Sequence, residues 1–173
     1  MKMTLALSIV LSAFMFLFGC KENQEKNVHE EPKTDLIKDN FPDKQKEVKA
    51  VLDSLFVSIQ NREIEELLSY HLYSDKFTEF TDGLPRTGSI ENKKNERQLI
   101  ENIAAFDYDL GALKIDVFDD VAIVTFNADF RPKIGDNVVQ LWRQGTIVFV
   151  KYNNVWRITH EHFSPINVKE NEN

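Results

Sequence analysis

The apolar residues of this 173-residue chain follow three successive patterns. Residues 3–18 form an almost unbroken apolar run, which follows a single positive charge at Lys2. Between residues 48 and 106, apolar positions recur every three or four residues, as on one face of a helix. From residue 113 to residue 163 they alternate with polar positions, as in a half-buried strand. The chain is therefore predicted to contain a targeting segment, then helices, then strands.

Three helices are predicted in the middle of the chain. The first carries one continuous apolar stripe, made of Val48, Val51, Leu52, Leu55, Phe56 and Ile59. Asp43 is the predicted N-cap of this helix. The second helix is short and contains Ile64, Leu67 and Leu68, with His71 just after it. The third carries Leu99, Ile100, Ile103 and Phe106 at the same spacing. Residues 77–88 are expected to form a loop between the last two.

The strands begin where the period changes to two. Alternating segments are predicted at residues 113–117, 122–130, 137–152 and 155–163. Asp119-Asp120 indicates a hairpin turn. Asn153-Asn154 suits a two-residue hairpin loop, because Asn tolerates positive φ. Helices followed by antiparallel strands favour an α+β fold.

The Asn153-Asn154 hairpin assigns side chains to two faces. If pairing continues without interruption from Tyr152 opposite Val155, one face carries Arg143, Ile147, Phe149, Trp156, Ile158, His160 and His162. The other carries Trp142, Gln144, Val148, Val150, Arg157, Thr159, Glu161 and Phe163. His162 is then expected opposite Gly145 and diagonal to Arg143, facing a gap that suits a polar or anionic ligand. The second face is unusually apolar for a solvated surface and is expected to bind a partner.

Residues 155–164 and the preceding Arg143-Gln144-Gly145-Thr146 resemble the last strands of SnoaL-like domains of the nuclear-transport-factor-2-like superfamily. Residues 75–80 and 113–117 fit the same family, and the resemblance spans about residues 44–166. It implies an α+β fold with three N-terminal helices packed in the concave face of a strongly bent antiparallel sheet, a cone-shaped, cystatin-like roll. It also implies an internal pocket and a homodimer through the outer sheet face. It implies no fixed reaction, since the superfamily contains isomerases, cyclases, dehydratases and non-enzymatic binding modules.

The N-terminal run has the build of a secretory signal peptide and is shorter than the ~20 residues of a spanning helix. Its ending, Leu17-Phe18-Gly19-Cys20, resembles the lipobox of bacterial lipoproteins. That resemblance implies cleavage of residues 1–19 and acylation of Cys20, and so a membrane anchor. Lys21-Glu22 resembles export signals of surface lipoproteins in the Bacteroidetes. We expect a protein of the bacterial cell envelope, anchored in the outer membrane, with surface exposure as an open alternative.

Composition and charge set the domain plan. Residues 20–42 are polar and are predicted to be a disordered tether, residues 43–166 a single domain, and residues 167–173 a polar tail. The net charge of −7 lacks the basic footprint of a nucleic-acid binder, and no nucleotide-binding motif occurs. Cys20 is the only cysteine, which excludes an intramolecular disulfide.

The leading functional hypothesis is binding of a small, partly apolar, anionic or carbonyl-bearing ligand without chemistry. The candidate polar contacts are Arg143, His162, His160 and Tyr70. The candidate apolar walls are Phe77, Phe80 and Trp156. One alternative is an acid/base enzyme of the isomerase, cyclase or dehydratase type, with His162 as the proton-transfer group. Another is a dimeric interaction module without a ligand, with a dimer face made of Trp142, Val148 and Val150.

His160 and His162 share a strand face at a spacing that can suit a metal. Further ligands would have to come from His71, Glu79 or Asp109, and nothing in their spacing singles them out. We therefore expect no metal and no cofactor.

Overall fold

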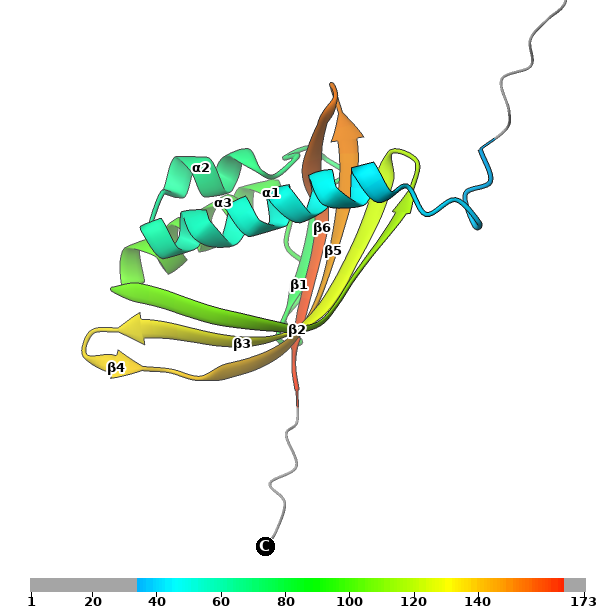
Figure 1. Ribbon diagram of the computed structural model, residues 1–173. Coiled ribbons are helices and arrows are strands. Elements are labelled where there is room, and N and C mark those ends of the chain that lie inside the picture. The colour runs from blue at the N-terminus through cyan, green and yellow to red at the C-terminus, as the bar shows by residue number, and fades with distance from the viewer. Residues whose placement is uncertain (1–33, 167–173) are drawn as a thin grey trace, which may run out of the picture. The chain divides into compact units, whose positions relative to one another are not determined.

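A computed structural model describes residues 34–166 of the chain (Figure 1). The predicted signal peptide, Cys20, most of the predicted tether and the polar tail lie outside these residues. Within residues 34–166, no helix is long and apolar enough to cross a membrane.

The first helix, α1 (Pro42–Asn61), confirms the predicted stripe: Val48, Leu52, Leu55 and Phe56 are all buried. The predicted N-cap is wrong. The cap residue is Phe41, whose φ of 47° is left-handed, and no side chain bonds to the helix end. Pro42 opens the helix because its fixed φ suits the first turn and its missing N–H leaves no donor unsatisfied.

Helices α2 (Ile64–Ser69) and α3 (Ser89–Asn102) follow. The predicted third helix is too long. Ile103 already has extended backbone at the end of α3, and Phe106 belongs to a strand. Helix α3 buries only Asn92 and Ile100. The helical spacing of apolar residues therefore ran past the end of α3 into the strand that follows it.

Six strands form one sheet: β1 (Thr78–Thr81), β2 (Ala105–Phe118), β3 (Val121–Ile134), β4 (Asn137–Val138), β5 (Leu141–Tyr152) and β6 (Val155–Pro165). The order is β1-β6-β5-β3-β2, with β4 paired to β3. The sheet is strongly curved and α1 lies across its concave side (Figure 1). The predicted α+β fold is confirmed with one correction. The pair β1–β6 is parallel, so the sheet is mixed, and residues 78–81 form a strand where a loop was predicted.

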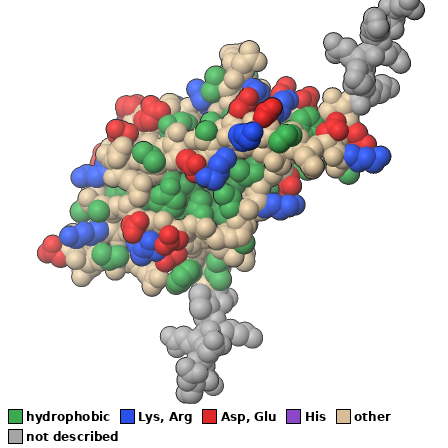
Figure 2. Space-filling model, viewed as in Figure 1, with side chains coloured by type: hydrophobic (Ala, Val, Ile, Leu, Met, Phe, Trp, Pro, Cys, Tyr) green, Lys and Arg blue, Asp and Glu red, His purple; other side chains and the backbone are tan. Residues whose placement is uncertain are grey.

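The core lies between the apolar stripe of α1 and the concave face of β3, β5 and β6. Its largest fully buried side chains include Phe149, Leu52, Ile147 and Ile158. On the face seen in Figure 2, apolar side chains gather between α1 and the sheet, with charged side chains around them. Several side chains of the edge strand β2 are only partly buried against this core. The edge strand therefore covers one side of the core incompletely.

The predicted turns are confirmed. Asn153 and Asn154 both have positive φ, 50° and 62°, and join β5 to β6 as a two-residue loop. Asp119 has a φ of 59° in the turn between β2 and β3. The Lys44 Nζ donates to Asp119 Oδ1 at 2.5 Å, which ties this turn to the start of α1.

The predicted pairing of β5 with β6 holds only as far as Phe149 opposite Ile158. The next pair is Val148 opposite His160, so Thr159 is an extra residue in β6 and forms a β-bulge. A shift of one residue exchanges the two faces of a strand. Beyond the bulge, Glu161 and Phe163 take the inward positions that the uninterrupted register had assigned to His160 and His162.

The gap predicted opposite Gly145 does not occur. Gly145 pairs with Phe163 on β6 and with Phe126 on β3. A Cβ on Gly145 would lie 2.5 Å from the Phe126 ring. The glycine thus makes room for a core phenyl ring and leaves no space for a ligand beside itself.

Candidate functional site

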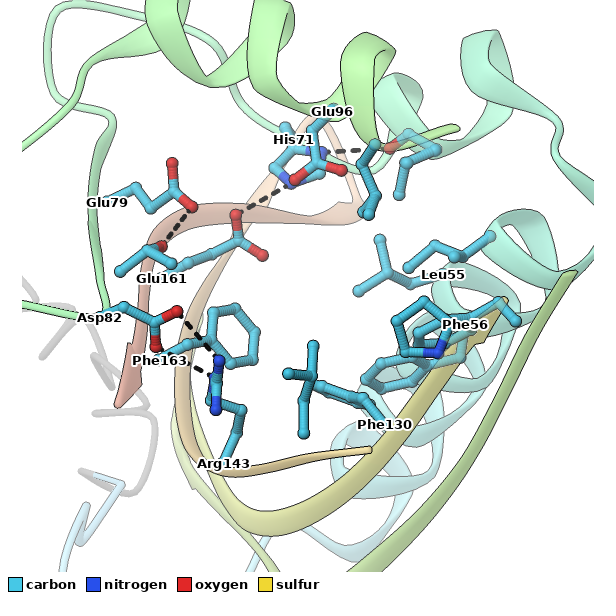
Figure 3. A pocket seen from close by; sticks show the side chains of 17 residues that line it. Leu55, Phe56, His71, Glu79, Asp82, Glu96, Phe130, Arg143, Glu161 and Phe163 are labelled. Atoms are coloured by element: carbon cyan, nitrogen blue, oxygen red, sulfur yellow. Dashed lines mark hydrogen bonds and ion pairs between the residues drawn. The ribbon is translucent and has the colours of Figure 1, made fainter. Parts of the chain in front are cut away.

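A cavity of about 240 Å³ lies between the helices and the concave face of the sheet (Figure 3). Its apolar wall includes Leu55, Phe56, Leu99, Phe106, Phe130 and Phe163. Its titratable groups are His71, Glu79, Asp82, Glu96, Arg143 and Glu161. An apolar hollow with a few converging polar groups is the usual form of a small-molecule site.

His71 is positioned by a short extension of the sheet just after α2. The Leu72 N–H donates to the Ile158 carbonyl at 2.7 Å, and the Ile158 N–H donates to the Tyr70 carbonyl at 2.8 Å. These bonds attach residues 70–72 to the edge of β6, immediately before the bulge. The imidazole is thereby held at the wall of the cavity.

The His71 ring is buried and forms two hydrogen bonds. Its Nδ1–H donates to the Leu67 carbonyl at 3.1 Å, and Nε2 lies 3.2 Å from Glu161 Oε2. Both side chains of this pair are almost fully buried. Because a carbonyl can only accept, the proton on Nδ1 is fixed, and a second proton lies between Nε2 and the carboxylate. Burial lowers the pKa of His71, but the charge and the hydrogen bond of Glu161 outweigh it and leave the pKa raised.

Glu96 reaches the same place from α3. Its carboxyl and the donor atoms of His71 and Glu161 lie within 4.8 Å of one another, and Figure 3 shows the three side chains converging at one end of the cavity. Burial and the charge of Glu161 raise the pKa of Glu96 to about 8, while His71 acts in the opposite direction. The Glu96 carboxyl is therefore protonated at neutral pH. It loses its proton at a pH only slightly above neutral.

Glu79 on β1 is another buried carboxylate in this wall. It accepts hydrogen bonds from Thr81 Oγ1 at 2.7 Å and Thr87 Oγ1 at 2.9 Å. The buried Asn92 adds a third, from Nδ2 at 3.0 Å, and its Oδ1 accepts from the Tyr73 hydroxyl. Three donors thus satisfy Glu79, and the network fixes α3 against β1.

Arg143 lines the cavity, as predicted, but its guanidinium is already paired. Nε lies 3.0 Å from Asp82 Oδ1, and Nη2 donates to Asp82 Oδ2 at 3.0 Å. This two-point pair joins β5 to the turn after β1 (Figure 3). Its positive charge is consequently balanced without a ligand.

The bulge removes the predicted histidines from the site. His160 and His162 point to the outer face, where the Thr78 hydroxyl is hydrogen-bonded to His160 Nδ1 at 2.8 Å. Phe80 lies beside them, with its ring centroid 6.2 Å from each imidazole, and is 42% exposed. The predicted contact between Arg143 and His162 is wrong, and neither histidine lines the cavity.

The other predicted pocket residues do not line the cavity. The Tyr70 hydroxyl donates to Glu66 and belongs to a separate hollow on the surface of α1 and α2. Phe77 is buried behind His71, with ring centroids 5.8 Å apart. Trp156 is a core residue whose indole N–H donates to Glu47 at 2.8 Å.

Among the residues named as further metal ligands, Asp109 is on the surface and pairs with Arg131. His71 and Glu79 do line the cavity, but His160 and His162 do not join them. The predicted histidine pair therefore has no third ligand near it in the described part of the chain.

Three titratable residues of the cavity do not follow from the sequence patterns: Glu161, Glu96 and Asp82. Glu161 was assigned to the outer face because the hairpin register was continued past Ile158. The one available signal was Phe163, a large apolar residue that the same register also placed outside. Glu96 lies in a highly charged helical segment, and a solvated position was the simpler interpretation.

Comparison with known proteins agrees with this architecture. The family model described as SnoaL-like domain matches residues 48–168. No curated protein matches the chain. A proposed dehydratase of the NTF2-like family from Streptomyces avermitilis is 20% identical and covers 73% of this chain and 99% of its own, with a TM-score of 0.68.

Two further solved structures are similar. An NTF2-like protein from Cytophaga hutchinsonii is 15% identical, covering 74% of this chain and 100% of its own, with a TM-score of 0.60. A proposed scytalone dehydratase from Novosphingobium aromaticivorans is 13% identical, covering 75% and 97%, with a TM-score of 0.64. Identities this low establish the fold alone. The family match over residues 48–168 leads to one conclusion: this chain belongs to the SnoaL-like domain family, and its fold is that of the NTF2-like structures.

Proposed function

We propose that the domain binds a small, partly apolar molecule in the cavity between its helices and its sheet. The observation that carries this proposal is the composition of the cavity wall. Apolar side chains form most of it, and His71, Glu96 and Glu161 converge at one end. The volume of about 240 Å³ is just below the usual range of ligand pockets and suits a molecule built around one ring.

A binding experiment with a blocking variant tests the proposal. A panel of one-ring compounds, containing neutral, anionic and cationic members, is screened against the full-length protein by ligand-observed NMR. Leu99 lines the cavity, so Leu99→Trp should fill it and abolish binding. Ile90→Trp is the matched control, because Ile90 lies on the same helix and is 80% exposed. If no compound binds, or if Leu99→Trp leaves binding unchanged, the proposal is wrong.

A second candidate function is acid/base catalysis, which the pKa of Glu96 favours. A carboxyl with a pKa of about 8 can both donate and accept a proton near neutral pH. The His71–Glu161 pair beside it holds a further mobile proton. In this candidate the proton-transfer group is Glu96 instead of His162. The proposed dehydratases among the similar structures are compatible with this candidate.

Hydrogen exchange tests the catalytic candidate. One-ring ketones are incubated with the protein in deuterated buffer, and exchange of their α-hydrogens is followed by NMR. Catalysis by Glu96 predicts that Glu96→Gln slows the exchange by about 100-fold. Glu65→Gln should retain it, because Glu65 is exposed and pairs with Arg97. Equal rates with and without protein would contradict the candidate.

For localisation, we propose that the domain is held at the bacterial cell envelope by acyl chains on Cys20. Support comes from the lipobox-like Leu17-Phe18-Gly19-Cys20 and the polar segment after it. The ligand would then be a molecule available in the cell envelope.

For assembly, we propose a homodimer through the outer face of the sheet. Val148 pairs with Ile123, and Val150 pairs with Val121, so these four side chains lie together on that face. Val121 is 39% exposed and Ile123 is 37% exposed. Trp142 is exposed on the same face of β5. A second copy of the chain would cover this apolar group.

A further inference from the structure

Hydrogen-bond acceptors outnumber donors at the polar end of the cavity. Six titratable residues line the cavity, of which four are carboxylic acids and two are bases. The Arg143 guanidinium is paired with Asp82. The two nitrogens of the His71 ring are hydrogen-bonded to Leu67 and Glu161. Both bases are therefore already engaged within the protein.

The carboxyl groups are not all engaged. Glu79 accepts three hydrogen bonds, and Asp82 has Arg143. Among residues 34–166, however, no hydrogen bond reaches the Glu96 carboxyl, and Glu161 uses only Oε2. The groups left for a ligand are thus carboxyl oxygens, one on Glu161 and both on Glu96, and Glu96 can give up its proton when a cation arrives. The complementary ligand group is a positively charged donor.

We propose that the ligand of this cavity carries a protonated amino group, which sits between Glu96 and Glu161 while its apolar part lies against the phenyl rings. This inference rests on the proposed binding function and specifies the class of ligand. It replaces the expectation of an anionic ligand, which depended on a free Arg143 and on His162.

The spacing of the carboxyl groups suits one ammonium group. Their oxygens lie within 4.8 Å of each other, and a charge-assisted hydrogen bond measures about 2.7–2.9 Å. One ammonium nitrogen can therefore reach both carboxyl groups at once. His71 stays beside it, with its Nδ1–H held by the Leu67 carbonyl.

The remainder of the cavity distinguishes an organic cation from a bare metal ion. Phe56, Phe130 and Phe163 lie in the wall beyond the acidic end, as Figure 3 shows. A ring or a short alkyl chain would bury its surface against them, and phenyl faces also attract cations. A metal ion would use only the acidic end and would leave this apolar part of the cavity without a partner.

Binding of an ammonium group should release a proton. Glu96 is faced by His71 from the end of α2, by Glu79 from β1 and by Glu161 from β6. Its pKa of about 8 means that it is protonated at pH 7, and an incoming cation stabilises the ionised form instead. Alkylammonium groups, like that of Lys, keep their proton to about pH 10. The affinity should therefore rise with pH between 6 and 9.

Three probes with the same apolar part test the inference: 2-phenylethylamine, 2-phenylethanol and phenylacetate. Their affinities for the full-length protein are measured by titration calorimetry at pH 8.5. We expect the amine to bind about tenfold more tightly than the alcohol, and the carboxylate to bind most weakly. Glu96→Gln, which resembles the protonated residue, should remove the preference for the amine, and the exposed Glu65→Gln should keep it.

The outcomes separate this inference from the function on which it rests. If amine and alcohol bind equally, the cationic ligand is refuted and the binding cavity stands. If none of the probes binds and the wider panel also fails, the binding function itself is refuted. The inference would also be overturned if the wild-type protein binds Zn²⁺ but does not prefer the amine to the alcohol, and if Glu96→Gln weakens the binding of Zn²⁺. In the wild-type protein, an amine affinity that does not rise between pH 6 and 9 counts against it independently of any variant.

Discussion

His71 and Glu161 are 90 residues apart in the chain, and their side chains meet at 3.2 Å in the buried wall of the cavity. The contact depends on both backbones. Residues 70–72 are bonded to Ile158, and the bulge at Thr159 turns Glu161 inward. One irregular residue in β6 thus brings an acid to the imidazole and sends two histidines to the outer surface.

Removing one member of this pair should be costly. His71→Leu leaves Glu161 buried without its partner and should lower the free energy of unfolding by about 3–5 kcal/mol. Glu161→Leu should cost less, because an imidazole can become neutral near pH 7 while keeping its bond to Leu67. The double variant should cost less than the sum of the two. Urea denaturation measures all three, and strictly additive losses would show that the pair is not coupled.

Gly145 should not tolerate a side chain. The Cβ of alanine would lie 2.5 Å from the Phe126 ring, so Gly145→Ala should destabilise the fold by about 1–3 kcal/mol. Adding Phe126→Leu should recover part of the loss, because it removes the ring from that position. Gly111→Ala is the control, since nothing lies within 4 Å of its added Cβ. Equal denaturation midpoints for the two alanine variants would contradict this packing.

Between about pH 5 and pH 9, the stability of the protein should fall as the pH rises, and Glu96 should account for part of the fall. Its pKa is about 8 when folded, against 4.5 for an ordinary Glu. Between these values the folded state binds more protons than the unfolded chain, so unfolding becomes easier as pH increases. The raised pKa of His71 acts in the same direction, and His71 is present in both the wild type and a Glu96 variant.

Glu96→Gln isolates this effect. It should match the wild type in stability at pH 5, where Glu96 is protonated, and exceed it at pH 9, where Glu96 is ionised. Urea denaturation at the two pH values gives the comparison. A difference between the two proteins that stays constant from pH 5 to pH 9 would rule out a raised pKa at Glu96.

The proposed homodimer predicts a loss of association when charge is placed on the outer sheet face. Val148→Arg with Val150→Glu should give a monomer in light scattering, because burying these charges is unfavourable. Val57→Arg with Ile90→Glu introduces the same charges on exposed helix positions and should leave the mass unchanged. A dimer that survives the first pair of substitutions does not use this face.

The proposed anchor predicts that Cys20→Ser abolishes acylation. The protein should then move from the membrane fraction to the soluble fraction, since the acyl chains are its link to the bilayer. Immunoblotting of the two fractions, with metabolic labelling by a fatty acid, measures this. A substitution of Ser12, within the apolar run, should leave the labelling unchanged. Membrane association of Cys20→Ser at the wild-type level would refute the proposal.

Local patterns alone determined several features of this protein. The apolar stripe of α1 and the turn at Asn153-Asn154 were predicted from residues close together in the chain, because helix periodicity and positive φ are local properties. The fold class followed from the order of the elements and from the resemblance of residues 143–146 and 155–164 to a known family.

The candidate site was decided by the tertiary structure. A bulge changes the direction of every later side chain in β6, and its position depends on pairing with β5, β1 and residues 70–72 together. No local pattern marks Thr159 as the extra residue. Glu96 looks solvated in the sequence because its neighbours are charged, and only the packing of α3 against α2 and its bond to β1 bring this half-buried acid to the cavity. The sequence by itself therefore determined the elements and their order, whereas contacts between distant segments decided which side chains face the cavity.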